Sequence, residues 1–409
     1  MKNEVTKSPA APGGAGFWKS NLRNYGLLGS LLVIMGFFEF LTGGVLLAPV
    51  NITNLVLQNS YIVIMALGML LIIVGGNIDL SVGSIVGFVG AIAATLMVDY
   101  KMPWVPVVGL SLVLGALIGS AQGYFVAFAR IPSFIVTLGG MLIFRGLTGN
   151  ILLGQFVGPF PQDFQSISSG FIPDVLSAPL VAVFGGSSAF SPTFRWTSML
   201  IGMLGAGLLI VTSARRWRRE KAHTMETEPF ALFAGKNAVF AILIVGLSYL
   251  LASYRGLPNV LVIMGLLILL YMFVTTRMTI GRRVYALGGN RLAAQLSGVR
   301  TERLIFLTFV NMGVLAGLAG LIVAARLNSA TPSAGNSFEL DVIAACFIGG
   351  ASASGGVGKV MGVVIGAFVM GVMNNGMSIL GIGIYWQYVV KGIVLLAAVY
   401  VDVYQKNNG

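Results

Sequence analysis

The feature that most constrains this chain is the repetition of apolar stretches about as long as a membrane-spanning helix. A helix needs about 20 predominantly apolar residues to cross the hydrocarbon core of a bilayer. Such stretches run over residues 25–41, 52–74, 78–98, 105–128, 131–153, 196–214, 238–252, 258–275, 304–324, 357–380 and 384–401. A shorter one, 341–351, ends in glycines and predicts a half-helix. We therefore expect an all-α polytopic membrane protein with about 12 membrane passages, one of them this half-helix.

Composition agrees with this expectation and narrows the function classes. The chain is 56% hydrophobic and only 9% charged, with a mean hydropathy of +0.91, which a soluble domain cannot tolerate. The net charge of +12 does not indicate nucleic acid, because most basic residues fall in short segments between the apolar stretches. The single cysteine, Cys346, excludes an internal disulfide, and the single histidine, His223, excludes a histidine-based metal cluster. We expect neither a metal nor a bound cofactor.

The distribution of Lys and Arg predicts the orientation. Cytoplasmic loops carry an excess of these residues, which places both termini and segments 215–236 and 277–303 in the cytoplasm, and segment 154–195 in the periplasm. Residues 1–24 read as a flexible cytoplasmic tail, and residues 25–409 as one transmembrane permease domain. Segment 154–195 contains five prolines and is either a disordered connector or a docking surface.

Segment 277–303, RMTIGRRVYALGGNRLAAQLSGVRTER, is the most informative polar stretch. It carries six arginines against one acid, Glu302. Residues 291–296 are good helix formers, with Asn290 suited to the N-cap and Gly298 to the C-cap. These features predict one short helix exposed on the cytoplasmic face. The alternative interpretation is an ordinary loop that only connects two membrane helices.

The sequence of this loop, GRRVYALGGNRLAAQLSGV, resembles the cytoplasmic loop of the ribose, xylose and multiple-monosaccharide permeases of bacterial ATP-binding-cassette importers. The blocks GNIDLSVGS, IPSFIVTLGGMLIFRG, PSAGNSFELDVIAACFIGGASASGGVGK and NNGMSILGI look like family blocks in the same order, from about residue 51 to residue 402. The resemblance implies a fold like that of type II importer permeases. It also implies that the short helix docks on a partner ATPase through Gly289, Asn290, Arg291, Ala293, Ala294, Gln295, Leu296, Ser297 and Gly298.

Further expectations follow from this resemblance. The chain would be a homodimeric permease in the bacterial inner membrane, surrounded by lipid, taking sugar from a periplasmic binding protein, with ATP and Mg on the separate ATPase. The apolar pair 196–214 and 238–252 looks like the two-helix addition of the longer permeases, which points to xylose or a mixture of pentoses and hexoses. Residues 355–360 resemble a phosphate loop, but Ala353 and Val360 stand where the Walker pattern requires Gly and Ser or Thr. An ion-coupled secondary sugar transporter is the alternative, and the scarcity of acids in the apolar stretches argues against it.

Polar groups inside or beside the apolar stretches are candidates for the sugar pathway, since a sugar is recognised by amides and hydroxyls. The candidates are Asp79, Asn311, Asn336, Glu339, Asn374 and Asn375. Asp79 precedes Leu80-Ser81 and either caps the following helix or lines the pathway. Glu39, Arg145 and Lys391 also lie in apolar stretches, where an ionised group needs a partner, and the sequence does not identify these partners.

Two glycine patterns predict packing. Glycines at small-xxx-small spacing, as in Gly115, Gly119 and Gly123 or Gly313 and Gly317, allow helices to approach closely in lipid. In addition, IIVGGNIDLSVGSIVGFVGA resembles CFIGGASASGGVGKVMGVVIGA, which is either an internal repeat or a coincidence of two glycine-rich blocks.

Overall fold

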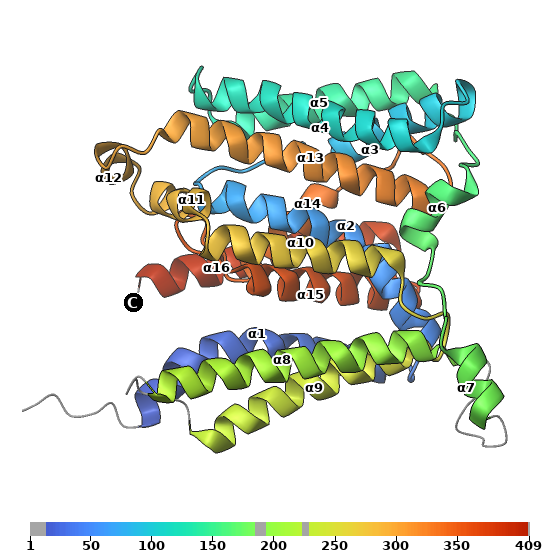
Figure 1. Ribbon diagram of the computed structural model, residues 1–409. Coiled ribbons are helices and arrows are strands. Elements are labelled where there is room, and N and C mark those ends of the chain that lie inside the picture. Colours follow the sequence, from blue (N-terminus) through green and yellow to red (C-terminus); the bar gives the residue numbers. More distant parts are fainter. Residues whose placement is uncertain (1–13, 185–193, 223–228, 408–409) are drawn as a thin grey trace, which may run out of the picture.

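The computed structural model describes residues 14–184, 194–222 and 229–407, and almost all the secondary structure within them is helical. Figure 1 shows the long helices side by side, with their axes running in nearly the same direction. The helices are α1 (Gly14–Leu41), α2 (Pro49–Val74), α3 (Val82–Ala94) with the π-helical turn η1 (Thr95–Asp99), α4 (Trp104–Ala127), α5 (Ser133–Leu152), α6 (Gln162–Ser169), α7 (Ser177–Phe184), α8 (Trp196–Ala222), α9 (Phe230–Ala252), α10 (Asn259–Thr276), α11 (Thr279–Gly289), α12 (Arg291–Leu296), α13 (Thr301–Leu327), α14 (Phe338–Ile348), α15 (Val360–Ile379) and α16 (Ile384–Asn407).

Every apolar stretch of the sequence is helical in the structure. Ten helices of the described ranges are long and apolar enough to cross a membrane, and α1 has a shorter apolar part, Gly26–Leu41. The predicted half-helix is α14, with 11 residues. The all-α membrane fold is therefore confirmed, whereas the count of about 12 passages stays a prediction.

The observed helices extend beyond the apolar stretches at several places. Helix α1 begins at Gly14, so the second half of the predicted tail 1–24 is helical, and residues 1–13 lie outside the described part. Helix α8 continues to Ala222 through the basic residues that were assigned to the loop 215–236. Segment 154–195 contains α6 and α7, and segment 277–303 contains α11 before the predicted α12. Short helices of this kind lack the long apolar stretch on which the prediction rested.

Helices α2, α3, α13 and α15 lie in the interior of the bundle. Of the central residues of α2, 89% are buried inside the protein, against none for α16, so α2 is enclosed by other helices while α16 lies at the periphery. Helix α13 packs between α2, α3 and α4. Helices α8 and α9 pack mainly on each other, and Figure 1 shows this pair beside α1, on the opposite side of the molecule from α4 and α5.

Glycines permit the closest helix crossing, that of α4 with α13. A Cβ atom on Gly115 would lie 2.3 Å from the carbonyl oxygen of Gly313, and one on Gly119 would lie 2.3 Å from that of Phe309. No larger residue fits at these positions without moving a backbone. The packing role that the glycine spacing predicts is thus confirmed at this crossing.

The similarity between the two glycine-rich blocks has a structural counterpart. At the end of α2, the amides of Gly76 and Asn77 donate to the carbonyls of Ile73 and Ile72 (2.9 and 3.0 Å). At the end of α14, the amides of Gly350 and Ala351 donate to those of Phe347 and Cys346 (2.9 Å each). Both sets are Schellman caps, and Gly76 and Gly350 adopt the positive φ that this cap requires (78° and 82°).

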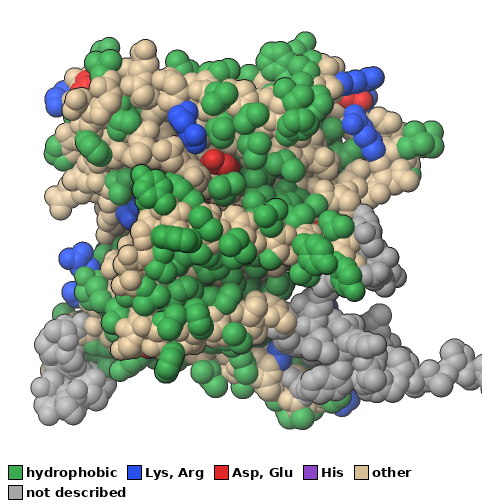
Figure 2. Space-filling model, turned by 180° about the vertical axis from the view of Figure 1, so that it is seen from behind, with side chains coloured by type: hydrophobic (Ala, Val, Ile, Leu, Met, Phe, Trp, Pro, Cys, Tyr) green, Lys and Arg blue, Asp and Glu red, His purple; other side chains and the backbone are tan. Residues whose placement is uncertain are grey.

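The two ends of the bundle differ. Helices α6 and α7 lie at one end, while α12 and the C-terminus lie at the other, which we call the α12 end (Figure 1). In Figure 2, charged side chains gather mostly toward these ends, and hydrophobic side chains dominate the surface between them. This distribution is that of a protein whose middle faces hydrocarbon.

Candidate functional site

Helix α12 is the predicted coupling helix, and its caps form as expected. The side-chain oxygen of Asn290 accepts a hydrogen bond from the amide of Ala293 (2.9 Å), and the helix ends at Ser297, followed by Gly298 with φ +80°. Gln295 donates to the hydroxyl of Thr301 (2.9 Å), which ties α12 to the start of α13. The short helix is therefore a defined element.

The exposed face of α12 is apolar. Leu292 and Leu296 are four residues apart, hence on one face, and they are 67% and 83% exposed. In Figure 2, hydrophobic side chains project at the corner where α12 lies, beside Lys and Arg. Two exposed leucines on a short polar segment are typical of a helix that docks into a groove of a partner.

The predicted contact residues differ in exposure. Ala294 is only 5% exposed, so it packs against the protein, and its contact with the ATPase stays a prediction. Leu292, which that set omitted, belongs to the exposed face. The remaining predicted residues, Gly289, Asn290, Arg291, Ala293, Gln295, Leu296, Ser297 and Gly298, are all exposed. A six-residue helix shows too little periodicity for its buried side to be read from sequence.

Helix α11 connects α12 to the core by backbone contacts. The Cα of Gly288 lies so close to α2 that a Cβ there would be 1.7 Å from the carbonyl oxygen of Val74. The same oxygen accepts a hydrogen bond from the amide of Gly356 (2.9 Å), and Tyr285 donates to the carbonyl of Gly358 (2.9 Å). The end of α2, the turn before α15 and α11 therefore meet at one junction.

This junction also explains the sequence that resembles a phosphate loop. The amide of Gly356 is used by Val74, and Gly355 lies against Gly288. On the other side, Asp402 of α16 accepts hydrogen bonds from the hydroxyl of Ser352 and the amide of Ala353 (3.1 Å each). The turn packs against protein on both sides, in agreement with the missing Walker residues.

Helix α14 carries two acids, each paired with a base from another helix. Asp341 forms an ion pair with Lys391 of α16 (2.9 Å) and accepts hydrogen bonds from Tyr61 (2.9 Å) and Asn374 (3.2 Å). It is 1% exposed, so without these partners an ionised form would be very costly. These contacts identify the partner of Lys391 and bring Asn374 into a buried network.

The second acid of α14 is Glu339, 7% exposed, whose carboxylate lies 3.8 Å from the guanidinium of Arg145. The side chain of Arg145 is 41% exposed, so this pair reaches the surface of the bundle, unlike the pair of Asp341. Asn336, in the turn before α14, is exposed as well. Among the predicted pathway residues, Glu339 and Asn336 thus share one region near the start of α14.

The other predicted pathway residues are used in packing. Asn375 and Asn51 form a reciprocal amide pair (2.9 and 3.3 Å), and Asn311 accepts a hydrogen bond from Tyr271. Asp79 accepts from the amide and hydroxyl of Ser81 (2.9 and 2.6 Å), which is the N-cap residue of α3, so Asp79 holds the turn before the helix and does not itself cap α3. Glu39 accepts from the amide of Leu47 (2.8 Å).

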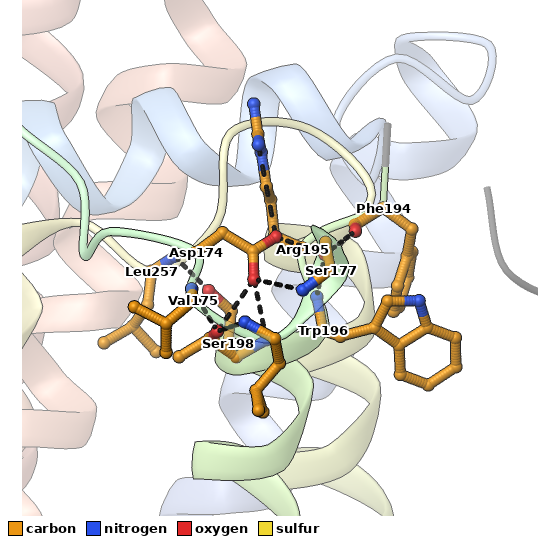
Figure 3. Close-up of polar contacts among 10 residues, drawn as sticks. Asp174, Val175, Ser177, Phe194, Arg195, Trp196, Ser198 and Leu257 are labelled. Carbon is orange, nitrogen blue, oxygen red and sulfur yellow. Dashed lines mark hydrogen bonds and ion pairs between the residues drawn. The ribbon is translucent and has the colours of Figure 1, made fainter. Parts of the chain in front are cut away.

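At the end opposite α12, Asp174 joins the start of α7 to the start of α8 (Figure 3). Its carboxylate accepts hydrogen bonds from Ser177, at the start of α7, and from Thr197, at the start of α8, and lies 4.0 Å from the guanidinium of Arg195. Partial burial opposes ionisation, but the hydrogen bonds from Ser177 and Thr197 outweigh it and hold the pKa of Asp174 below its ordinary value. No local sequence signal singled out Asp174.

A bundle of long apolar helices, with the exposed α12 at one end and the starts of α7 and α8 at the other, defines a membrane protein that crosses the bilayer several times. The family described as branched-chain amino acid transport system / permease component matches residues 51–399, and the chain belongs to this family.

Individual relatives are similar over most of their length. The xylose transport system permease protein XylH of Escherichia coli is 39% identical over 96% of this chain and 95% of its own. The protein of the same name from Haemophilus influenzae is 39% identical over 95% of this chain and 98% of its own. The ribose import permease protein RbsC of Escherichia coli is 33% identical over 86% of this chain and 85% of its own. No solved structure matches the chain.

Proposed function

We propose that this permease imports xylose. It is the membrane subunit of a sugar importer of the ATP-binding-cassette type, and ATP hydrolysis belongs to a separate subunit. The choice of xylose over ribose is supported by the higher identity to the xylose permeases over a larger share of the chain. In the broader form of this proposal, the permease imports several pentoses and hexoses.

The coupling role is supported by one observation: two exposed leucines, Leu292 and Leu296, lie on the capped helix α12. The α12 end faces the cytoplasm and receives the ATPase, which carries ATP and Mg. The opposite end, where Asp174 joins the starts of α7 and α8, faces the periplasm and receives the sugar-binding protein. Two copies of the chain enclose the pathway in the inner membrane, with both termini in the cytoplasm.

The pathway itself is assigned to the region of Glu339, Arg145 and Asn336. A half-exposed arginine within an apolar helix is costly against lipid, so it should face a polar passage. Asn374 belongs to the network behind α14, and Asn311, Asn375 and Asp79 support packing; none of these four faces the passage.

The test uses the permease reconstituted in proteoliposomes with its ATPase, ATP inside and the binding protein outside. We expect uptake of radiolabelled xylose that requires both ATP and the binding protein, with ribose transported less well. Equal uptake driven by a proton gradient, without the ATPase, would support an ion-coupled carrier and contradict the proposal.

A further inference from the structure

Beside α12, a hollow of about 440 Å³ lies between α11 and the start of α13. Three arginines line it, Arg283, Arg300 and Arg303, and all three are exposed. Among the residues that the structure describes, no carboxylate forms an ion pair with any of them. Three guanidinium groups around one hollow repel each other, so this arrangement favours an anion within it.

The rest of the lining is apolar. It consists of Ile280, Val299, Leu304 and Leu307, together with Gly298. Helix α13 rises about 1.5 Å per residue, so Leu307 lies about 6 Å further along the helix than Arg303, toward the hydrocarbon. Leu307 is 45% exposed. The hollow is therefore cationic at its outer end and apolar at its inner end, at the level where α13 enters the bilayer.

We infer that this hollow binds an anionic phospholipid of the leaflet on the α12 side. Arginine matches phosphate in geometry and charge, and basic pockets between membrane helices accept anionic headgroups. The first methylenes of an acyl chain would lie along Leu304 and Leu307. An acidic segment of a protein would satisfy the arginines but not the apolar inner end, which is why a lipid fits better. Gly298 is part of the lining, so a bound lipid would contact the turn between α12 and α13.

The test measures lipid retention by the purified full-length permease, using native mass spectrometry. Protein is released from nanodiscs of phosphatidylcholine with and without phosphatidylglycerol. We expect the native chain to retain phosphatidylglycerol selectively and the double variant Arg300→Gln/Arg303→Gln to bind it roughly 30-fold more weakly, since each basic residue near a membrane surface contributes about a factor of five. Arg277→Gln is the control, because Arg277 belongs to the same basic segment but does not line the hollow.

The other outcomes decide against the inference. Equal retention by the double variant would exclude the site. Displacement of phosphatidylglycerol by millimolar inorganic phosphate, with no effect of Leu307→Asn, would show a free-phosphate site. Unchanged lipid retention with lost binding of the ATPase would assign the hollow to the ATPase interface. Because retention is measured without the ATPase, its result is independent of the proposed transport function.

Discussion

Neighbouring side chains of α12 differ sharply in what a substitution should do. Leu296 is 83% exposed, whereas Ala294 is 5% exposed. We expect Leu296→Asp to leave the permease folded and to weaken its binding to the ATPase roughly 10- to 100-fold, because a buried leucine contributes about 1.5–3 kcal/mol. The measurement is co-purification of the ATPase with the detergent-solubilised permease.

The matched comparison for that prediction is Ala294→Asp. A carboxylate at this buried position has no room and no partner, so this variant should lose folded permease itself, seen as aggregation in size-exclusion chromatography. If Leu296→Asp bound the ATPase normally, α12 would not be the docking helix.

Asn375 was predicted to line the sugar pathway, but its hydrogen bonds with Asn51 indicate a packing role. Since Asn375 and Asn51 share two hydrogen bonds, Asn375→Leu leaves the buried side-chain oxygen of Asn51 without a donor, at a cost of about 1–3 kcal/mol, while its nitrogen keeps the bond to the carbonyl of Leu46 (2.8 Å). We expect a lower thermal unfolding midpoint, and a smaller loss in the double variant Asn51→Leu/Asn375→Leu, which removes both amides. An unchanged midpoint with reduced sugar uptake would instead place Asn375 in the pathway.

At the scale of elements, the junction of α11 with α2 depends on one glycine. Gly288→Ala would place a methyl group against the carbonyl oxygen of Val74, whereas a Cβ on Gly289 meets nothing within 4 Å. We expect Gly288→Ala to displace α11 and to lower both the unfolding midpoint and ATP-driven uptake, with a stability cost of about 1–3 kcal/mol. Gly289→Ala is the control for the unfolding midpoint, and equal midpoints for the two variants would mean that the contact does not matter.

The segment between α6 and α8 should depend on pH through Asp174. Because the folded state lowers the pKa of this carboxyl, ionised Asp174 stabilises the segment above the unfolded pKa, about 3.9, and this stabilisation is lost as pH falls through the folded value. We expect cleavage by pepsin in residues 170–184 to increase at the lowest pH values. Asp174→Asn should be cleaved readily at all pH values; unchanged protection would rule out this role.

For the whole molecule, the homodimer is the assembly to test. One chain has a mass of 43.0 kDa. The mass of the complex of permease and ATPase, measured by light scattering, should therefore equal two permease chains plus the ATPase subunits. A complex with a single permease would leave the face of Arg145 and Glu339 without a second copy to enclose the pathway, and would contradict the proposed arrangement.

The sequence predicted the parts of this architecture that depend on local pattern. The apolar stretches, the half-helix α14 and the cap at Asn290 follow from hydropathy and helix signals, and all are present. The pairing of Lys391 with Asp341 joins residues 50 positions apart, and that of Asn51 with Asn375 joins residues 324 apart. Such pairs depend on how the helices assemble, which local pattern does not specify.

The junction at Val74 has one more consequence. The carbonyl of this residue accepts from Gly356 and lies against Gly288, so the end of α2, in the first glycine-rich block, and the turn between α14 and α15, in the second, meet at a single atom. A displacement that enters through α11 therefore reaches both blocks at once. We therefore expect the end of α2 and the turn before α15 to move together when the ATPase changes its nucleotide state.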